Sequence, residues 1–219
     1  MKNITFETLN EIFSKARISP YLKNEDNAEK VLFKYHLNIA LSEAMIPILH
    51  YFEICFRNRV DQIINEYYSS NWLIDLPNSL LISDQDVKKI KEVISKIRRG
   101  NKGVCLHDDI VGQMTFGFWC SFFHRKYDPI IWHRKDAIKT MFPNLRRMHR
   151  KRSYLEDKIF KIKDIRNRIA HHEPIWDREV LLFEAYTMCH EFLQAMSQDA
   201  ADMLKTIDRF PSVYSINFP

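Results

Sequence analysis

The sequence predicts an all-α protein, and three observations carry that prediction. Apolar residues recur at spacings of three and four along most of the chain, which is the period of an amphipathic helix. No stretch alternates apolar and polar residues as a half-buried strand does. Only 4 of the 219 residues are glycine, and they are placed where no phosphate-binding glycine loop can be written. We therefore expect an antiparallel helical bundle and exclude nucleotide-dependent kinases and Rossmann enzymes.

The first half of the chain predicts three helices. A short amphipathic helix ends before Pro20. A long helical pattern covers about 28–68, and Pro47 is expected to kink or break it because proline lacks the N–H that a helix interior needs. Ser83 opens a capped helix that Gly100 is expected to close.

The second half predicts further helices and a core segment. Residues 116–123 are apolar almost all round and lack interleaved basic residues, so a buried helix is preferred to a base-stacking platform. Residues 130–142 form a helical pattern stopped by a proline. Two long helical patterns follow, at about 150–171 and 176–205, separated by Glu173 and Pro174. The whole chain, 1–219, is expected to form a single all-helical domain.

Composition limits the remaining classes of function. The 33 basic and 28 acidic residues give a net charge of +5, which permits an anionic partner without requiring one. The 4 cysteines show no paired spacing, so neither a disulfide framework nor a zinc site is expected, and no cofactor is expected. The apolar stretch 39–56 contains Glu43, His50 and Glu53, which argue against a membrane span. We expect a cytoplasmic protein without membrane contact.

The most informative stretch is 164–174. Arg166 lies on the apolar stripe of the expected helix, where a guanidinium costs free energy unless a partner or a cleft receives it. Pro174 disfavours helix at the residue before it, so the helix should end near His171 or His172. Either imidazole can then turn back toward the arginine.

These side chains suit the cleavage of RNA without a metal. Attack of a 2′-hydroxyl on the neighbouring phosphorus needs a base, an acid, and a cation beside the phosphoryl oxygens. Imidazole exchanges protons near neutral pH, and arginine can donate to two phosphate oxygens at once. Asn167 could orient the histidine or the substrate, and two copies of the chain would supply both acid and base. The chain has 15 arginines and 9 histidines, so the spacing of Arg166 and His171 alone identifies nothing.

Longer segments carry a family resemblance. Residues 165–172, IRNRIAHH, resemble the RN-x₃-H signature of Abi-like proteins, bacterial abortive-infection proteins of the AbiD/AbiF type. Residues 53–58, EICFRN, are similar to the E-x₃-RN helix of that family. Segments 36–43 and 116–119 also resemble its pattern, and the matches run in order from about 30 to 176.

The resemblance implies a HEPN-like fold with additional N-terminal helices, usually dimeric, and metal-independent endoribonuclease activity in phage defence or toxin–antitoxin systems. It assigns phosphate binding to Arg166, proton transfer to His171, and the polar position beside the arginine to Asn167. His172 satisfies the looser spacing of the motif, so the choice between the two histidines stays open.

Two further groups have open roles. Glu53 and Arg57 stand four residues apart, the favourable order for a helical ion pair, and with Asn58 they either orient the bundle or enter the RNA site. Five basic residues precede the motif helix and form either the rim of an RNA-binding surface beside the motif or a solvated surface; they are Arg146, Arg147, Arg150, Lys151 and Arg152.

Three functions remain compatible with the sequence. The first is an endoribonuclease with Arg166 and His171 at its centre. The second is a non-catalytic module that binds a small noncoding RNA or an antitoxin through the same surface. The third gives the arginine and histidines only a structural role in a homodimer interface.

Overall fold

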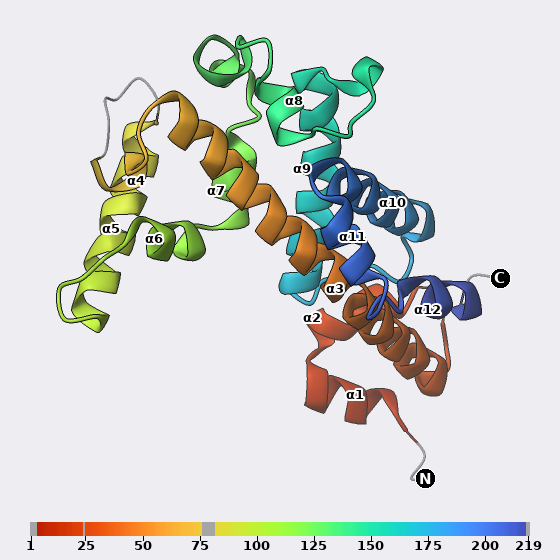
Figure 1. Ribbon diagram of the computed structural model, residues 1–219. Coiled ribbons are helices and arrows are strands. Elements are labelled where there is room, and N and C mark those ends of the chain that lie inside the picture. Colours follow the sequence, from red (N-terminus) through yellow and green to blue (C-terminus); the bar gives the residue numbers. More distant parts are fainter. Residues whose placement is uncertain (1–3, 24, 76–81, 218–219) are drawn as a thin grey trace.

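The computed structural model describes residues 4–23, 25–75 and 82–217, and within these the chain forms helices and turns without a strand (Figure 1). The prediction of an all-α fold is confirmed. The α-helices are α1 (Phe6–Phe13), α2 (Lys15–Ile18), α3 (Ala28–Tyr67), α4 (Trp72–Asp75), α5 (Asp84–Gly100), α6 (His107–Gln113), α7 (Phe116–Ser121), α8 (Ala137–Met141), α9 (Arg152–Ala170), α10 (Glu179–Met196), α11 (Gln198–Leu204) and α12 (Phe210–Asn217). Short 3₁₀ or π turns join some of them: η1 (Ser19–Tyr21), η2 (Arg125–Tyr127), η3 (Asp128–Trp132) and η4 (Arg147–His149).

The 40-residue helix α3 runs through the whole molecule. Pro47 lies inside it, and the helix continues past this residue, so of the expected kink or break the break does not occur. Helices α9, α10 and α11 lie along one part of α3, and α4 to α6 gather at its other end (Figure 1). Within the described residues α3 is the one helix long and apolar enough to cross a membrane, and its inward face belongs to the core of the bundle.

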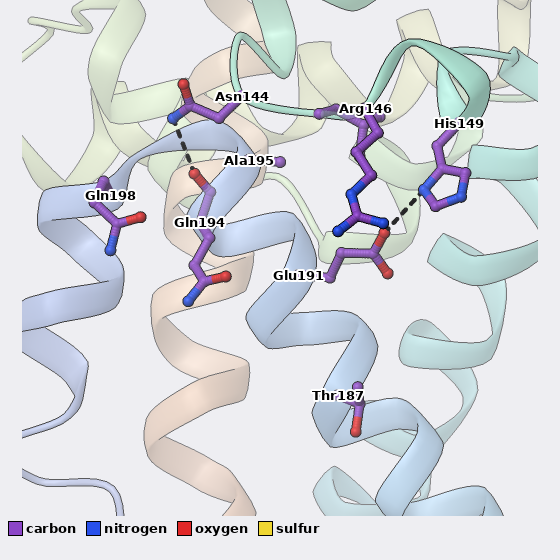
Figure 2. Close-up of a pocket in the computed structure, with 9 residues that line it drawn as sticks. Asn144, Arg146, His149, Thr187, Glu191, Gln194, Ala195 and Gln198 are labelled. Carbon is purple, nitrogen blue, oxygen red and sulfur yellow. Dashed lines mark hydrogen bonds and ion pairs between the residues drawn. The ribbon is translucent and has the colours of Figure 1, made fainter.

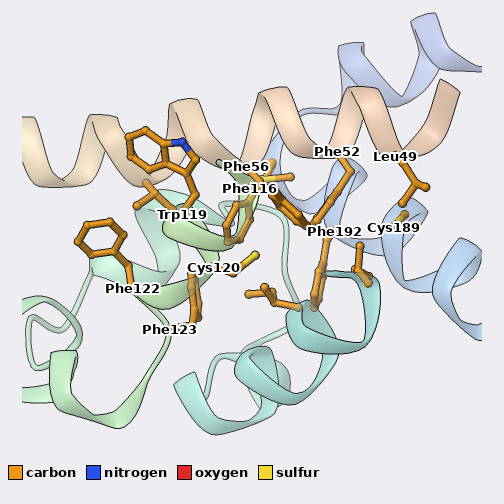
Figure 3. Packing of buried hydrophobic residues seen from close by; sticks show 14 of the residues in the cluster. Leu49, Phe52, Phe56, Phe116, Trp119, Cys120, Phe122, Phe123, Cys189 and Phe192 are labelled. Atoms are coloured by element: carbon orange, nitrogen blue, oxygen red, sulfur yellow. The ribbon is translucent and has the colours of Figure 1, made fainter. Parts of the chain in front are cut away.

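Aromatic side chains fill the core between α3, α7 and α10 (Figure 3). Phe52 packs edge-to-face against Phe116, with ring centroids 6.0 Å apart, and stacks at 6.3 Å on Phe192 of α10. Trp119 and Phe123 are fully buried in the same cluster. The segment 116–123 is therefore core, as its composition predicts, and its burial leaves no aromatic face for a base.

Two predicted helices are divided in the structure. Residues 130–142 were expected to form one helix, but η3 and α8 are separated by the polar turn 133–136. Residues 176–205 were expected to be continuous, but Ser197 adopts an extended conformation (φ −159°, ψ 115°) and its side chain caps α11 by accepting from the Ala200 N–H. Helix α12 was not predicted.

The end of α3 is joined to α4 and α6 by a buried polar cluster. The carboxylate of Asp61, on α3, accepts at 2.8 Å from the indole N–H of Trp72 and lies 2.8 Å from Nε2 of His107. Asn65 donates to the second carboxylate oxygen, also at 2.8 Å. Loss of any of these contacts would leave a buried polar group without its partner, which is costly. The cluster therefore fixes α4 and α6 on α3.

Candidate functional site

The predicted motif occupies the last turn of α9 and the residues after it. The helix ends at Ala170, and His172 takes a left-handed backbone conformation with φ of 56°. The N–H of His172 donates to the Ile169 carbonyl at 3.1 Å, and the N–H of Glu173 donates to the Arg168 carbonyl at 2.7 Å. This pair of hydrogen bonds is the Schellman arrangement, which usually places glycine where His172 stands.

Contacts from other elements hold this helix end in place. Arg17, on α2, donates to the carbonyl of His172 at 2.6 Å. The buried side chain of Asn38, on α3, accepts from the N–H groups of Ile175 at 2.7 Å and Trp176 at 3.2 Å. The backbone that carries the two histidines is therefore fixed from both sides before any ligand binds.

Glu53 and Arg166 connect the two motif segments, which lie 113 residues apart in the sequence. The Nε atom of Arg166 donates to Oε2 of Glu53 at 3.0 Å, and Nη2 donates to Oε1 at 3.4 Å. The Arg166 side chain is 34% exposed and the Glu53 side chain is 22% exposed. Glu53 is thus the partner that the sequence analysis required for an arginine on the apolar stripe. No described side chain or carbonyl accepts from Nη1 of Arg166, so this nitrogen remains available to a ligand.

His171 and Asn167 flank the arginine on the open surface. The His171 side chain is exposed, and no described residue hydrogen-bonds to its ring. Asn167 is half-buried, and its backbone carbonyl accepts from the backbone N–H of His171 at 2.9 Å. His172 is exposed as well, but its backbone already terminates the helix. A proton-transfer group needs a free ring and a fixed backbone, and both histidines have these among the described residues, so the choice between them stays open.

Arg57 and Asn58 do not complete an ion-pair network with Glu53. Arg57 approaches the Gly112 carbonyl at 3.5 Å, and its Nε is buried without a partner among the described residues. Asn58 is exposed. Glu53 therefore binds the distant arginine in place of the one four residues away.

The basic run that precedes α9 is divided in its contacts. The Arg152 side chain is only 12% exposed. It donates a hydrogen bond to the Phe123 carbonyl and forms ion pairs with Asp128 and Glu156. Arg150 donates to the carbonyls of Leu145 at 2.8 Å and Pro143 at 3.2 Å. Both arginines stabilise the turn before α9. Arg146, Arg147 and Lys151 are exposed.

The position of this run also differs from expectation. Of its two predicted roles, a rim beside the motif or a solvated surface, the first requires the run to lie near the motif, but the 19 residues of α9 separate them, a rise of about 28 Å. Residues 146–151, which precede the first turn of α9, therefore lie far from His171. Any RNA contact by the run has to be made at a distance from the motif.

Within the described residues no group of three metal-binding side chains comes together. The cysteines are free, and burial raises the pKa of the Cys120 and Cys189 thiols strongly. A thiol held protonated is a poor nucleophile and a poor metal ligand. Cys120 and Cys189 therefore add no nucleophile to the groups at the end of α9.

The fold and the site define a helical protein whose two motif segments meet through one ion pair. Residues 6–177 match the family described as Abi-like protein, so the chain belongs to the Abi-like protein family. This assignment confirms the family resemblance. No curated protein and no solved structure gave a match.

Sequence reasoning missed how the helix end is held. Asn38 stands in the family-like segment 36–43 without an assigned role, and no pattern in the sequence points to Arg17. The signal for Asn38 was present: a buried amide on a helix face otherwise lined by Val31, Leu41 and Met45 needs donors. Arg17 gave no such signal, because its contact is with a backbone carbonyl 155 residues away.

Proposed function

We propose that the protein is a metal-independent endoribonuclease that acts in abortive infection of bacteria by phage, or as a toxin. Membership of the Abi-like family favours the biological role. The observation that carries the chemistry is the bidentate contact between Glu53 and Arg166 beside a free His171. It supplies an oriented cation and an imidazole on fixed backbone.

Each group has a defined role in this reaction. Arg166 donates from Nη1 to a phosphoryl oxygen and stabilises charge that develops in the transition state. His171 transfers a proton to or from the sugar and leaving-group oxygens. Asn167 lies one residue from the arginine and can orient substrate through its amide. Glu53 is a positioning residue, since it contacts the arginine and fixes its direction.

A second copy of the chain completes the site. The motif assigns one proton-transfer imidazole to each protomer, whereas transesterification needs both a base and an acid. The motif residues lie on an open surface, which two protomers related by a two-fold axis can close into one cleft. We therefore propose a homodimer as the active form.

The test is RNA cleavage in excess EDTA by the full-length protein. Wild type is expected to leave 2′,3′-cyclic phosphate ends, and His171→Ala is expected to fold normally and to cut nothing. Lys161→Ala, on the exposed face of the same helix, is the matched control and should cut as wild type does. Cleavage that survives in both His171→Ala and Arg166→Ala would refute the assignment.

One observation favours a second candidate, a non-catalytic module that binds a small structured RNA or an antitoxin. Glu53 already neutralises the charge of Arg166, and a paired guanidinium stabilises a developing anion less than a free one does. RNA that co-purifies with the protein and stays intact over time would support this module.

A further inference from the structure

One surface hollow of about 480 Å³, between α8 and η4, is lined by an excess of positive charge. Its wall carries five cationic side chains and one carboxylate: Arg134, Lys135, Lys139, Arg147, Arg150 and Asp136. Like charges gathered on a concave wall repel one another unless an anion enters between them. The hollow therefore has the charge of an anion-binding site.

Asp136 offsets only part of the positive charge of this hollow. Within the described chain none of the five forms an ion pair. Two of them are held against the wall by other contacts, because Arg150 donates to backbone carbonyls and the Arg134 guanidinium lies 4.4 Å from the ring centre of Tyr67. Lys135, Lys139 and Arg147 are exposed. Three cations without a side-chain partner among the described residues thus stand beside two that are held by contacts.

A neighbouring hollow provides the contrast (Figure 2). Arg146 and His149 line it together with Glu191, and Nδ1 of His149 lies 3.2 Å from a carboxylate oxygen of Glu191. Its positive groups therefore face an acidic partner. Arg146 lines this second hollow, whereas the next residue, Arg147, lines the first. The excess of positive charge therefore belongs to the lining of the first hollow and not to the whole segment.

The distance from the motif fixes what this hollow can do. It lies at the start of α9, and His171 lies at the other end, about 28 Å along the helix axis. A strand that keeps the duplex spacing of about 3.4 Å per nucleotide needs roughly eight nucleotides to cover this distance, and a more extended strand needs fewer. A concave site of this size admits the phosphates of a flexible strand.

We propose that this hollow binds the phosphate backbone of a single-stranded RNA roughly eight nucleotides away from the bond held at Arg166 and His171. This proposal rests on RNA being the ligand of the proposed function. Lys135, Lys139 and Arg147 contact successive phosphates, while Arg134 and Arg150 supply fixed charge behind them. The hollow sets the register of the RNA relative to the motif.

The binding experiment uses full-length protein carrying His171→Ala, so that RNA is not cut, and a labelled single strand of roughly twelve nucleotides, long enough to span the gap. Affinity is measured against salt concentration for this background and for the same protein with Lys135→Ala, Lys139→Ala and Arg147→Ala. A matched variant with Lys88→Ala, Lys96→Ala and Lys102→Ala removes equal charge from α5 and the loop after it, all at exposed positions.

Loss of three phosphate contacts should lower the slope of log affinity against log salt by about 2 in the hollow variant. The α5 variant should keep the slope of the background. Equal slopes in all three proteins, or an equal fall in both variants, would overturn the hollow as a site. Absence of RNA binding in the background protein would overturn it together with the proposed function.

A cleavage measurement separates the two proposals. With His171 intact, the hollow variant should raise the KM for the long strand and leave its kcat unchanged. Strands too short to span the gap should be cut equally by wild type and variant. If the long strand is cut with an unchanged KM, the hollow proposal fails while the nuclease assignment stands.

Discussion

Replacing Glu53 by glutamine tests the contact that joins the two motif segments. Exposed ion pairs contribute about 0–1 kcal/mol, and breaking a fully buried one costs about 3–5 kcal/mol. The Glu53 and Arg166 side chains are 22% and 34% exposed, and their contact is bidentate, so we expect a coupling energy of about 2 kcal/mol, between these limits. If Glu53→Gln lowers the free energy of unfolding by this amount, its Tm should fall by about 4–8 °C for a chain of this length.

The assay is a double-mutant cycle of Glu53→Gln and Arg166→Gln, followed by denaturant unfolding. The same helix offers a matched control, because Glu43 pairs with Arg209 and both of these side chains are more than half exposed. We expect the cycle of Glu43→Gln and Arg209→Gln to give less than about 1 kcal/mol. Equal coupling energies for the two pairs would refute the argument that partial burial makes Glu53 hold Arg166.

The activity of the same variants completes the test. If Glu53 positions the arginine, Glu53→Gln lowers both stability and RNA cleavage. Unchanged melting with lost cleavage would instead place Glu53 in direct contact with the substrate.

Three further substitutions have defined outcomes. Asn38→Ala leaves two backbone N–H groups without their acceptor and should cost about 2 kcal/mol in denaturant unfolding, whereas Asn38→Asp, which keeps an acceptor, should cost less; equal losses would show that the acceptor is unimportant. His172→Gly removes the strain of a left-handed non-glycine residue, so unfolding free energy should stay level or rise by up to about 1 kcal/mol and RNA cleavage should persist, while loss of cleavage would assign proton transfer to His172. Arg152→Met leaves Asp128 and Glu156 without their cation and should lower the unfolding free energy by about 3 kcal/mol, and a change in RNA affinity with unchanged stability would contradict its structural role.

The long helices could be predicted because their apolar residues repeat over many turns. Helices α3 and α9 agree with the expected ranges 28–68 and 150–171 to within a few residues. The expected helix at 130–142 failed because four consecutive polar residues, 133–136, form a turn between the apolar residues on either side. The expected helix at 176–205 failed at Ser197, whose hydroxyl competes for backbone N–H groups and starts a new helix.

The candidate site was predictable in its parts but not in its contacts. The motif string identified Arg166 and the end of the helix near His171, and the cost of burying a guanidinium required a partner. Local spacing offered Arg57 as the obvious companion of Glu53, four residues away. The structure pairs Glu53 with Arg166 across 113 residues, and no pattern confined to one helix reveals such a contact.

Helix α3 holds the two ends of the motif from opposite sides of its one internal proline. Asn38 binds the backbone that follows the histidines, Glu53 binds the arginine, and Pro47 lies between them. A proline leaves one hydrogen bond of the helix unmade, so bending is easiest at that point. Because Arg166 and His171 both lie at the end of α9, a bend at Pro47 would strain the contacts of Glu53 and Asn38 without changing the spacing of these two groups along α9. The two contacts from α3 therefore hold one helix end at two points, and the proline between them is where α3 can most easily adjust to both.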